Sequence, residues 1–324
     1  MKFKCCSTLL HSMNFQPNSL MACGYYYFLN YKGGLFDIED YRVARDKITD
    51  MLKRGEIPKG CQTCGILAER EWDESIGIDM LEISHRYTCS VCDCIYCIAT
   101  DADPKKKAFY NKLKPYDIRP VIINLRNNNI FFPNSTFCVN GGECAEYPKD
   151  ELNWLVYLAF KQKAKLSFLS SGILYSKTIE DALALTDSAI KVSVDAGTKD
   201  IYAKVKRVPA KTFDTVWKNL EKYIKAAQKR VENGGDSKVF IKYIIIPGIN
   251  DNIEQAQAFL DRCNAINCKY IDVSLEIHWK KRHYNNSGTE GIIAVANFFN
   301  QYKRDGLFIY FVPEAQEFLH KQLV

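Results

Sequence analysis

From residue 76 onward, short runs rich in β-branched residues alternate with longer amphipathic stretches. This alternation is typical of βα units, in which the strands pair into a parallel sheet and the helices cross over between them. The chain has 324 residues, which allows two domains or one large α/β barrel. Six runs predict strands, at Ile78 to Ser84, Thr136 to Asn140, Leu166 to Ser170, Ile190 to Asp195, Val239 to Ile246 and Tyr270 to Glu276.

The segments between these runs are long enough to hold crossover helices. Suitable capping residues, among them Thr178 and Asn252, stand at the starts of several helical segments. After the sixth strand we expect a helix near Ile292 to Lys303 and a strand near Leu307 to Val312. The apolar spacing predicts crossover helices at Asp150 to Lys163, Thr178 to Leu185, Lys211 to Val231 and Asn252 to Cys263.

The composition is that of an ordinary globular protein, with 47% apolar and 25% charged residues. The net charge of +6 is too diffuse to indicate a nucleic-acid partner, although it favours an anionic substrate. No segment approaches the roughly 18 apolar residues of a membrane span. The first residues carry no secretory pattern, because His11 interrupts the short apolar run. We therefore expect a cytoplasmic protein with reduced thiols.

Cysteine is unusually frequent, and nine of the 13 cysteines lie in the first 97 residues. An odd number of cysteines in a chain of this length favours metal or redox chemistry over a disulfide framework. Four of them, Cys89, Cys92, Cys94 and Cys97, follow the first predicted strand within nine residues. A loop at the carboxyl end of a parallel strand faces the ligand crevice, so these thiols are candidates for one metal centre.

Zinc is one possible occupant, since two CxxC pairs, Cys61 with Cys64 and Cys89 with Cys92, supply four thiolates. However, 24 residues separate the pairs, against about 15 to 20 in zinc ribbons. A zinc site would also leave Cys94 and Cys97 unexplained.

The cysteine loop resembles that of the radical S-adenosylmethionine (SAM) superfamily, whose members carry C-x3-C-x2-C after strand 1. Cys94-Ile95-Tyr96-Cys97 matches the second half, but the position four residues before Cys94 is Ser90. The first ligand is therefore Cys89, giving C-x4-C-x2-C, or less favourably Cys92. The resemblance implies a partial (β/α)6 barrel and a [4Fe-4S] cluster held by Cys89, Cys94 and Cys97, with one iron open to SAM.

The same resemblance implies the activity. An electron from a donor such as flavodoxin or ferredoxin cleaves SAM, and the resulting 5′-deoxyadenosyl radical abstracts hydrogen from a substrate, here a peptide or a sugar or other alcohol. The alternative is an iron-sulfur or zinc binding or sensor protein on the same scaffold that does not cleave SAM.

Further motifs support the resemblance and supply candidate SAM contacts. Gly141-Gly142-Glu143, after the second strand, looks like the family's GGE motif, which binds the SAM amino group. Ser193 and Asp195 alternate along the fourth strand, so we expect both to face a ligand. One of Lys204, Lys206 or Arg207 is a candidate to reach the SAM carboxylate. The complete set of candidate cofactor-binding residues is Tyr96, Gly141, Gly142, Glu143, Ser170, Ser193, Asp195 and Asn250.

The front of the chain resembles the auxiliary-cluster (SPASM or twitch) module of family members. Cys5 or Cys6, with Cys23, Cys61 and Cys64, would hold a second [4Fe-4S] cluster, although four such cysteines also suit zinc. We therefore expect three parts: an auxiliary module at 1–75, a radical SAM core at 76–290, and an αβ extension at 291–324.

Overall fold

The computed structural model describes residues 3–16, 19–21, 28–30, 38–62, 67–71, 77–84, 88–97, 105, 108–109, 112, 117–129, 131–276, 289–312 and 315–316. Its main feature is a ten-stranded sheet in the order β12-β11-β10-β9-β8-β7-β6-β2-β3-β4. The six predicted strands form its centre, as β6 (Ile78–Ser84), β7 (Phe131–Asn140), β8 (Lys165–Ser170), β9 (Ala189–Ser193), β10 (Lys238–Ile245) and β11 (Tyr270–Leu275).

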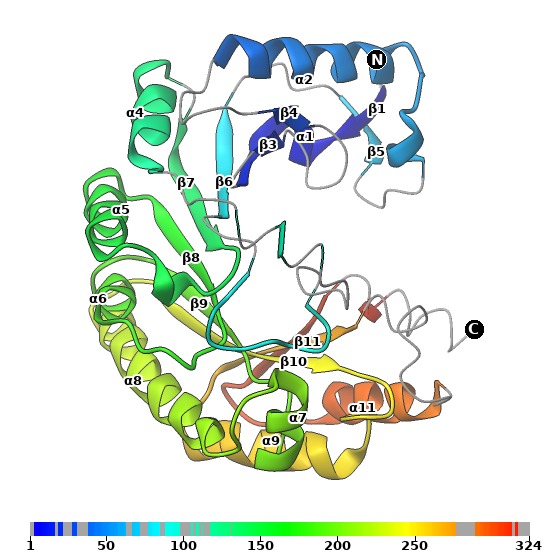
Figure 1. The fold of residues 1–324 in the computed structure, drawn as a ribbon, viewed down its shortest axis with the longest axis vertical. Coiled ribbons are helices and arrows are strands. Elements are labelled where there is room, and N and C mark those ends of the chain that lie inside the picture. Colours follow the sequence, from blue (N-terminus) through cyan, green and yellow to red (C-terminus); the bar gives the residue numbers. More distant parts are fainter. Residues whose placement is uncertain are drawn as a thin grey trace.

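All neighbouring pairs from β6 to β11 are parallel, and each strand lies beside the one before it in the chain. Two further parallel strands flank this group, β2 (Ser12–Gln16) beside β6 and β12 (Phe308–Phe311) beside β11. The predicted partial α/β barrel is confirmed, and its strands curve so that one face of the sheet is concave (Figure 1).

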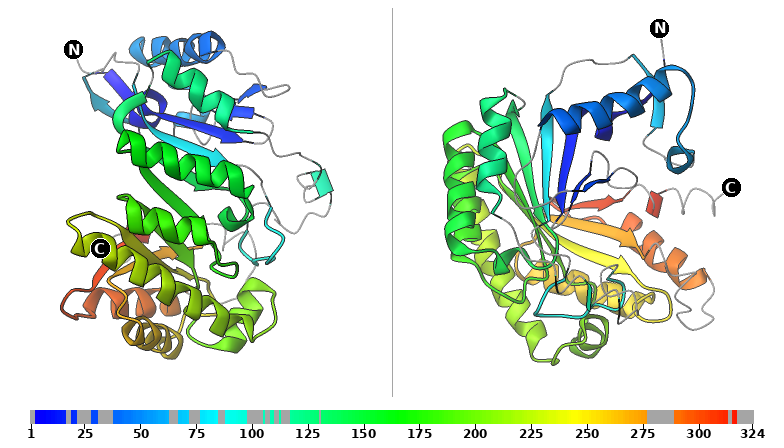
Figure 2. Two further views of the ribbon diagram at one scale, coloured as in Figure 1. Left: turned by 90° about the vertical axis from the view of Figure 1, so that its left-hand side faces the viewer. Right: turned by 45° about the horizontal axis from the view of Figure 1, so that its top comes forward.

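Helices cover the convex side of the sheet (Figures 1 and 2). None of the helices in the described residues has the length and apolar character needed to cross a membrane. The helices are α4 (Arg119–Asn127), α5 (Lys149–Gln162), α6 (Lys177–Leu185), α7 (Lys199–Lys206), α8 (Thr212–Glu232), α9 (Ile253–Ala265) and α11 (Glu290–Gln301), with a 3-10 turn η2 (Cys144–Glu146).

The amino-terminal residues add to this sheet. The antiparallel strands β3 (Ser19–Met21) and β4 (Phe28–Asn30) extend it beyond β2. A separate two-stranded sheet pairs β1 (Phe3–Cys6) with β5 (Leu67–Arg70), and this region also contains α1 (Ser7–His11), α2 (Ile38–Lys53) and η1 (Lys59–Cys61). The main sheet therefore runs across both expected domain limits, at residues 75 and 290.

Side chains alternate between the two faces of the central strands. On β6, Leu81 and Ile83 belong to the hydrophobic core under the helices, so Glu82 and Ser84 lie on the concave face. The same alternation on β10 places Ile241 in the core and Lys242 on the concave face. The concave face consequently carries polar side chains at these positions, while the core lies between sheet and helices.

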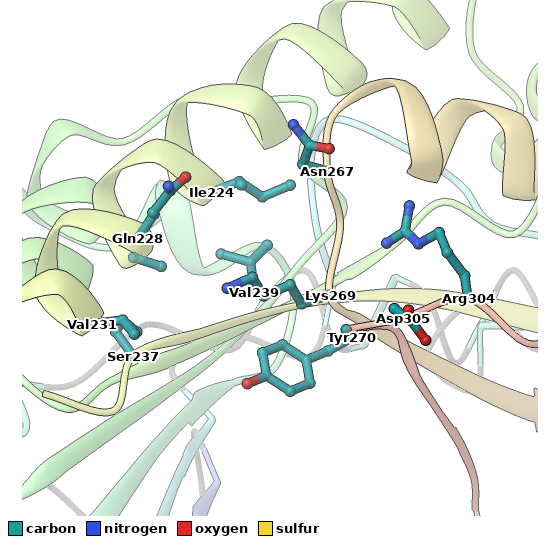
Figure 3. Close-up of a pocket in the computed structure, with 12 residues that line it drawn as sticks. Ile224, Gln228, Val231, Ser237, Val239, Asn267, Lys269, Tyr270, Arg304 and Asp305 are labelled. Carbon is teal, nitrogen blue, oxygen red and sulfur yellow. The ribbon is translucent and has the colours of Figure 1, made fainter.

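A pocket of about 430 Å³ opens at the amino ends of β10 and β11 (Figure 3). Its lining includes Gln228 of α8, Val239 and Tyr270 at the starts of these strands, and Arg304 and Asp305 before β12. Ligand chemistry in parallel α/β sheets and barrels is located at the carboxyl ends of the strands. This pocket therefore lies at the end of the sheet opposite to the expected ligand site.

Candidate active site at the carboxyl ends of the strands

The cysteine loop, residues 88–97, crosses the carboxyl ends of the strands. Near its start, the Ser90 backbone N–H donates to the Glu146 carboxylate in η2, after β7, at 3.2 Å. Near its end, the Ile95 N–H donates to the Val205 carbonyl at 3.0 Å, one of two backbone hydrogen bonds to the last turn of α7. The loop is thus fastened at both ends, on elements that follow the second and fourth barrel strands.

Three of its four sulfurs lie together. Cys92 Sγ is 3.3 Å from Cys89 Sγ and 3.6 Å from Cys94 Sγ. Hydrogen bonding to Cys92 lowers the pKa of the Cys89 thiol and lowers that of Cys94 to about 6, whereas the same contacts raise the pKa of Cys92. Cys97 is partly exposed in the same loop, and its N–H donates to the Cys94 carbonyl at 3.0 Å.

A buried polar triad anchors the end of the loop. The Tyr96 hydroxyl donates to Asp195 Oδ2 at 2.5 Å, and Lys206 Nζ donates to Asp195 Oδ2 at 2.6 Å and to the Tyr96 hydroxyl at 2.5 Å. The side chains of Lys206 and Asp195 are 1% and 0% exposed. Tyr96 also packs with Ile95 against a small apolar cluster that contains Ile244.

The charge states in this triad follow from its burial and its ion pair. Burial alone would lower the pKa of the Lys206 ammonium, but the nearby Asp195 carboxylate and Cys94 raise it above its ordinary value. Burial raises the pKa of Tyr96, as does the neighbouring Asp195. Lys206 is therefore a buried cation, and Tyr96 a neutral hydroxyl that donates to the carboxylate.

Asp195 and Asn250 are buried side chains that follow strands β9 and β10. β9 ends at Ser193, and Asp195 leaves the strand with φ of 60°, so Ser193 and Asp195 do not alternate along one strand. Asp195 Oδ1 accepts from the Ile244 N–H at 2.9 Å. Asn250 is fully buried, its Nδ2 donating to the carbonyls of Asp195 and Ile244 and its Oδ1 accepting from the Ile246 N–H. Both side chains tie strand ends together, whereas Ser193 is partly exposed on the concave face.

The glycine motif forms the turn after β7. Gly141 and Gly142 have φ of 79° and 64°, values that strongly favour glycine. The turn directs Glu143, 2% exposed, toward the end of β8, where its carboxylate accepts from the hydroxyls of Ser170 and Ser171 at 2.7 and 2.5 Å and from the Ser171 N–H at 2.7 Å. The structure therefore brings together Glu143 and Ser170, two of the candidate cofactor-binding residues.

This turn and the cysteine loop adjoin, since the charge of Glu143 acts on the Cys89 thiol and opposes the lowering of its pKa. The thiolate is the form of cysteine that binds metals, and cysteine thiolates are the usual ligands of iron-sulfur clusters. The loop therefore suits such a cluster. Within the described ranges, no group of three His, Cys, Asp or Glu side chains is close enough to hold a single metal ion.

The structure describes part of the predicted auxiliary site. Cys5 and Cys6 are neighbours on β1 and are both buried. Cys6 belongs to the hydrophobic core, so Cys5, on the other face of the strand, is the better candidate ligand of the two. Cys61 ends η1 and is partly exposed, whereas Cys23 and Cys64 lie outside the described residues.

Several residues of this site were not predicted in their observed roles. Lys206 was predicted only as a candidate SAM contact, and its buried pair with Asp195 has no distinctive local pattern. Tyr202, four residues before Lys206, is also buried, and this helical spacing places both on one face of α7. A lysine on the apolar face of this helix was the sequence signal that could have predicted a buried ammonium group. Ser171, next to Ser170, was missed as a partner of Glu143.

No family model matches the chain, and no curated protein matches it in sequence. Several solved structures share its fold. SuiB from Streptococcus suis bound to S-adenosylmethionine is 14% identical, with a TM-score of 0.53 over 86% of this chain and 57% of SuiB. SuiB bound to its precursor peptide SuiA is 12% identical, with a TM-score of 0.54 over 100% of this chain and 75% of that one.

A third match is anSMEcpe with bound AdoMet, 13% identical, with a TM-score of 0.50 over 72% of this chain and 63% of that one. The chain thus spans somewhat more than half of the first of these structures, at 57%. These neighbours are radical SAM enzymes, and the chain has the radical SAM fold.

Proposed function

We propose that this chain, whose fold is that of the radical SAM superfamily, cleaves S-adenosylmethionine reductively and uses the resulting radical to abstract hydrogen from a peptide. The observation that carries the proposal is the cysteine loop fastened across the carboxyl ends of the strands. Ligand sites of parallel α/β folds lie at this end, and the loop gathers thiols there.

In this proposal Cys89, Cys94 and Cys97 hold the [4Fe-4S] cluster. Cys92 is left out because its sulfur lies in contact with both Cys89 and Cys94, whereas three corners of a cluster need separate ligands. When bound, such a cluster supplies the electron that cleaves the sulfonium and an open iron that chelates SAM. Lys206, buried beside Cys94, favours the thiolate form of that ligand.

The remaining candidate residues would bind and orient SAM. The backbone of Gly141 and Gly142 is free of Cβ atoms and can approach an ammonium group closely. Glu143 holds this turn against β8 through its hydrogen bonds to Ser170 and Ser171. Ser193 offers a hydroxyl on the concave face.

Near the other end of the loop, Tyr96 would lie beside the adenosine. Asp195 and Asn250 would not contact SAM directly, since both are fully buried. They hold the strand ends on which the Tyr96 end of the loop packs.

A peptide is the preferred substrate class, because SuiB, one of the matching structures, was solved with its precursor peptide SuiA. A sugar or other alcohol is the second choice. The polar concave face beneath the cysteine loop is the proposed substrate site. We propose a cytoplasmic setting, where a flavodoxin or ferredoxin would supply electrons.

A second, auxiliary [4Fe-4S] cluster is proposed at Cys5, Cys23, Cys61 and Cys64. Four thiolates would give a closed cluster, able to relay electrons or to accept one from a substrate radical. The residues before position 75 would then combine two roles, since β2 also extends the main sheet.

Anaerobic reconstitution with iron and sulfide, followed by dithionite and SAM, tests the main proposal. We expect a reducible cluster and formation of 5′-deoxyadenosine. A reducible cluster without 5′-deoxyadenosine would instead support a sensor protein, and a colourless protein that retains zinc would support a zinc-binding module. About eight irons per chain would support two clusters, and about four would support one.

The choice of ligands has its own test in Cys89→Ala and Cys92→Ala, which remove neighbouring thiols of the same loop. We expect Cys89→Ala to lose the SAM-binding cluster and Cys92→Ala to retain it, as measured by iron content and the absorbance of the reconstituted protein. Loss of the cluster in Cys92→Ala alone would assign the first ligand to Cys92.

A further inference from the structure

The concave face carries a band of charged side chains across β9, β10 and β11. Strand register aligns Ser193 of β9 with Lys242 of β10, and Lys242 with Asp272 of β11. One position earlier on this face of β9, Lys191 forms an ion pair with Asp272 that spans β10. The ion pair shows that these side chains share the concave face with Lys242 between them.

The charges around Lys242 are otherwise matched. Two carboxylates act on its ammonium group, those of Asp195 and Asp272, together with two lysines, Lys191 and Lys206. Asp272 is paired with Lys191, and Asp195 with Lys206. Lys242 is therefore the extra cation of this group of five.

Lys242 has no direct partner among the residues that the structure describes, since its Nζ takes part in neither a hydrogen bond nor an ion pair there. Burial lowers the pKa of this ammonium group. Glu276, the residue just after β11, is largely buried and has an interaction of its own. A partly exposed cation with no partner is suited to an anionic ligand.

The position of Lys242 favours the substrate over the cofactor. Ile244, two residues further along β10, packs against Tyr96 and Ile95 of the cysteine loop. Two residues of a strand span about 6.6 Å. The Lys242 backbone is therefore further from the carboxyl end of β10 by this distance than Ile244, which the loop contacts.

Next to Lys242 on this face is a wall of aromatic rings. Phe240 of β10 lies 5.2 Å from Tyr270 and 6.0 Å from Tyr310, and Tyr270 stacks on Phe308 at 5.7 Å, measured between ring centroids. Phe308 and Tyr310, both on β12, remain 52% and 47% exposed. Exposed aromatic side chains beside a cation without a partner suit a ligand that is both apolar and acidic.

Building on the proposed function, we propose that Lys242 binds a carboxylate of the peptide substrate, with the neighbouring apolar part of that peptide against the wall of Phe240, Tyr270, Phe308 and Tyr310. Lys242 would then select for an acidic group at a fixed distance from the reacting position.

The test uses the reconstituted, iron-loaded protein with SAM and two small probes, N-acetyl-L-phenylalanine and N-acetyl-L-phenylalaninamide. They differ only in that the first has a carboxylate where the second has a neutral amide. Ligand-observed NMR measures both dissociation constants. We expect the acid to bind at least about tenfold tighter than the amide, the size expected from one hydrogen bond to a charged group.

Lys242→Gln should remove this preference, so that acid and amide bind equally. Lys238→Gln is the matched control, because Lys238 lies on the same strand and makes its ion pair with Asp236 at the far end. The control should keep the preference. Thermal unfolding of both variants checks that they fold, and Lys242→Met provides a second neutral replacement.

Three results of this binding measurement would overturn the proposal: no binding of the acid to the wild-type protein, equal binding of acid and amide, or a preference that persists in Lys242→Gln. Equilibrium dialysis measures the affinity of the wild-type protein and of Lys242→Gln for SAM. A loss of SAM affinity in Lys242→Gln would assign Lys242 to the cofactor carboxylate and also overturn the proposal. Formation of 5′-deoxyadenosine is measured separately, so failure of SAM cleavage is distinguished from failure of carboxylate recognition.

Discussion

Replacing Lys206 by methionine should destabilise the protein strongly. The variant leaves the Asp195 carboxylate buried, 0% exposed, without the cation that lies 2.6 Å away. Removing one partner of a buried ion pair costs about 3–5 kcal/mol of the free energy of unfolding, because the remaining charge is uncompensated. In a large domain each kcal/mol lowers the melting temperature by roughly 2 °C, so the expected fall is roughly 6–10 °C.

Thermal unfolding followed by circular dichroism measures this effect, with Lys204→Met as the control. Lys204 is exposed on the same helix, two residues away, and its replacement should change stability by less than about 0.5 kcal/mol. The double variant Lys206→Met with Asp195→Asn removes both charges and should recover most of the loss. If Lys206→Met melts no lower than Lys204→Met, the buried ion pair does not exist as described.

Two further predictions concern the ends of β7 and β8. Gly172→Ala should lower the free energy of unfolding by about 2–4 kcal/mol, because its φ is +73° and an added Cβ would lie 2.6 Å from a methyl group of Val192. Gly234→Ala is the control. Gly234 has φ of +80° and open space around it, so only the backbone strain of about 1 kcal/mol remains there. Equal losses in chemical denaturation would contradict the close approach. Glu143→Gln should cost about 1–3 kcal/mol, since each carboxylate oxygen accepts from a backbone N–H and the amide nitrogen must face one of them. The exposed Glu232→Gln serves as its control, and a wild-type melting temperature for Glu143→Gln would refute this account.

The central sheet could be predicted because its strands carry local patterns. The run Ile78 to Ser84 was predicted with the observed limits. The second strand begins at Phe131, earlier than predicted. Its first residues could not be predicted, because Pro133 interrupts the run and proline argues against a strand. Its pairing with β6 is irregular at that end, where the register shifts. The β-branched runs were enough to predict that the strands exist. The start of β7 was misplaced because proline is found in strands only at special positions.

Helix starts were predicted where the capping side chain had no close competitor. Asn252 accepts from the Gln255 N–H, as its position suggested. The predicted cap at Thr178 was wrong. Ser176 caps α6 instead, and its side chain accepts from the Ile179 N–H. Serine and threonine two residues apart offer nearly equal caps, and the choice between them depends on packing that a local pattern does not contain.

The anchoring of the cysteine loop could not be predicted, because it depends on three distant segments. Tyr96 and Lys206 are 110 residues apart in the chain, and Tyr96 and Asp195 are 99 apart. A lysine at a helix end is usually solvated; this one is buried because the left-handed backbone at Asp195 leaves the strand and places a carboxylate beside it. The same dependence explains why Lys206 matters to the proposed site. A cation that holds both the strand end and Tyr96 fixes where the loop lies. Its removal should therefore disturb the neighbouring Cys94, one of the proposed cluster ligands, even in molecules that remain folded.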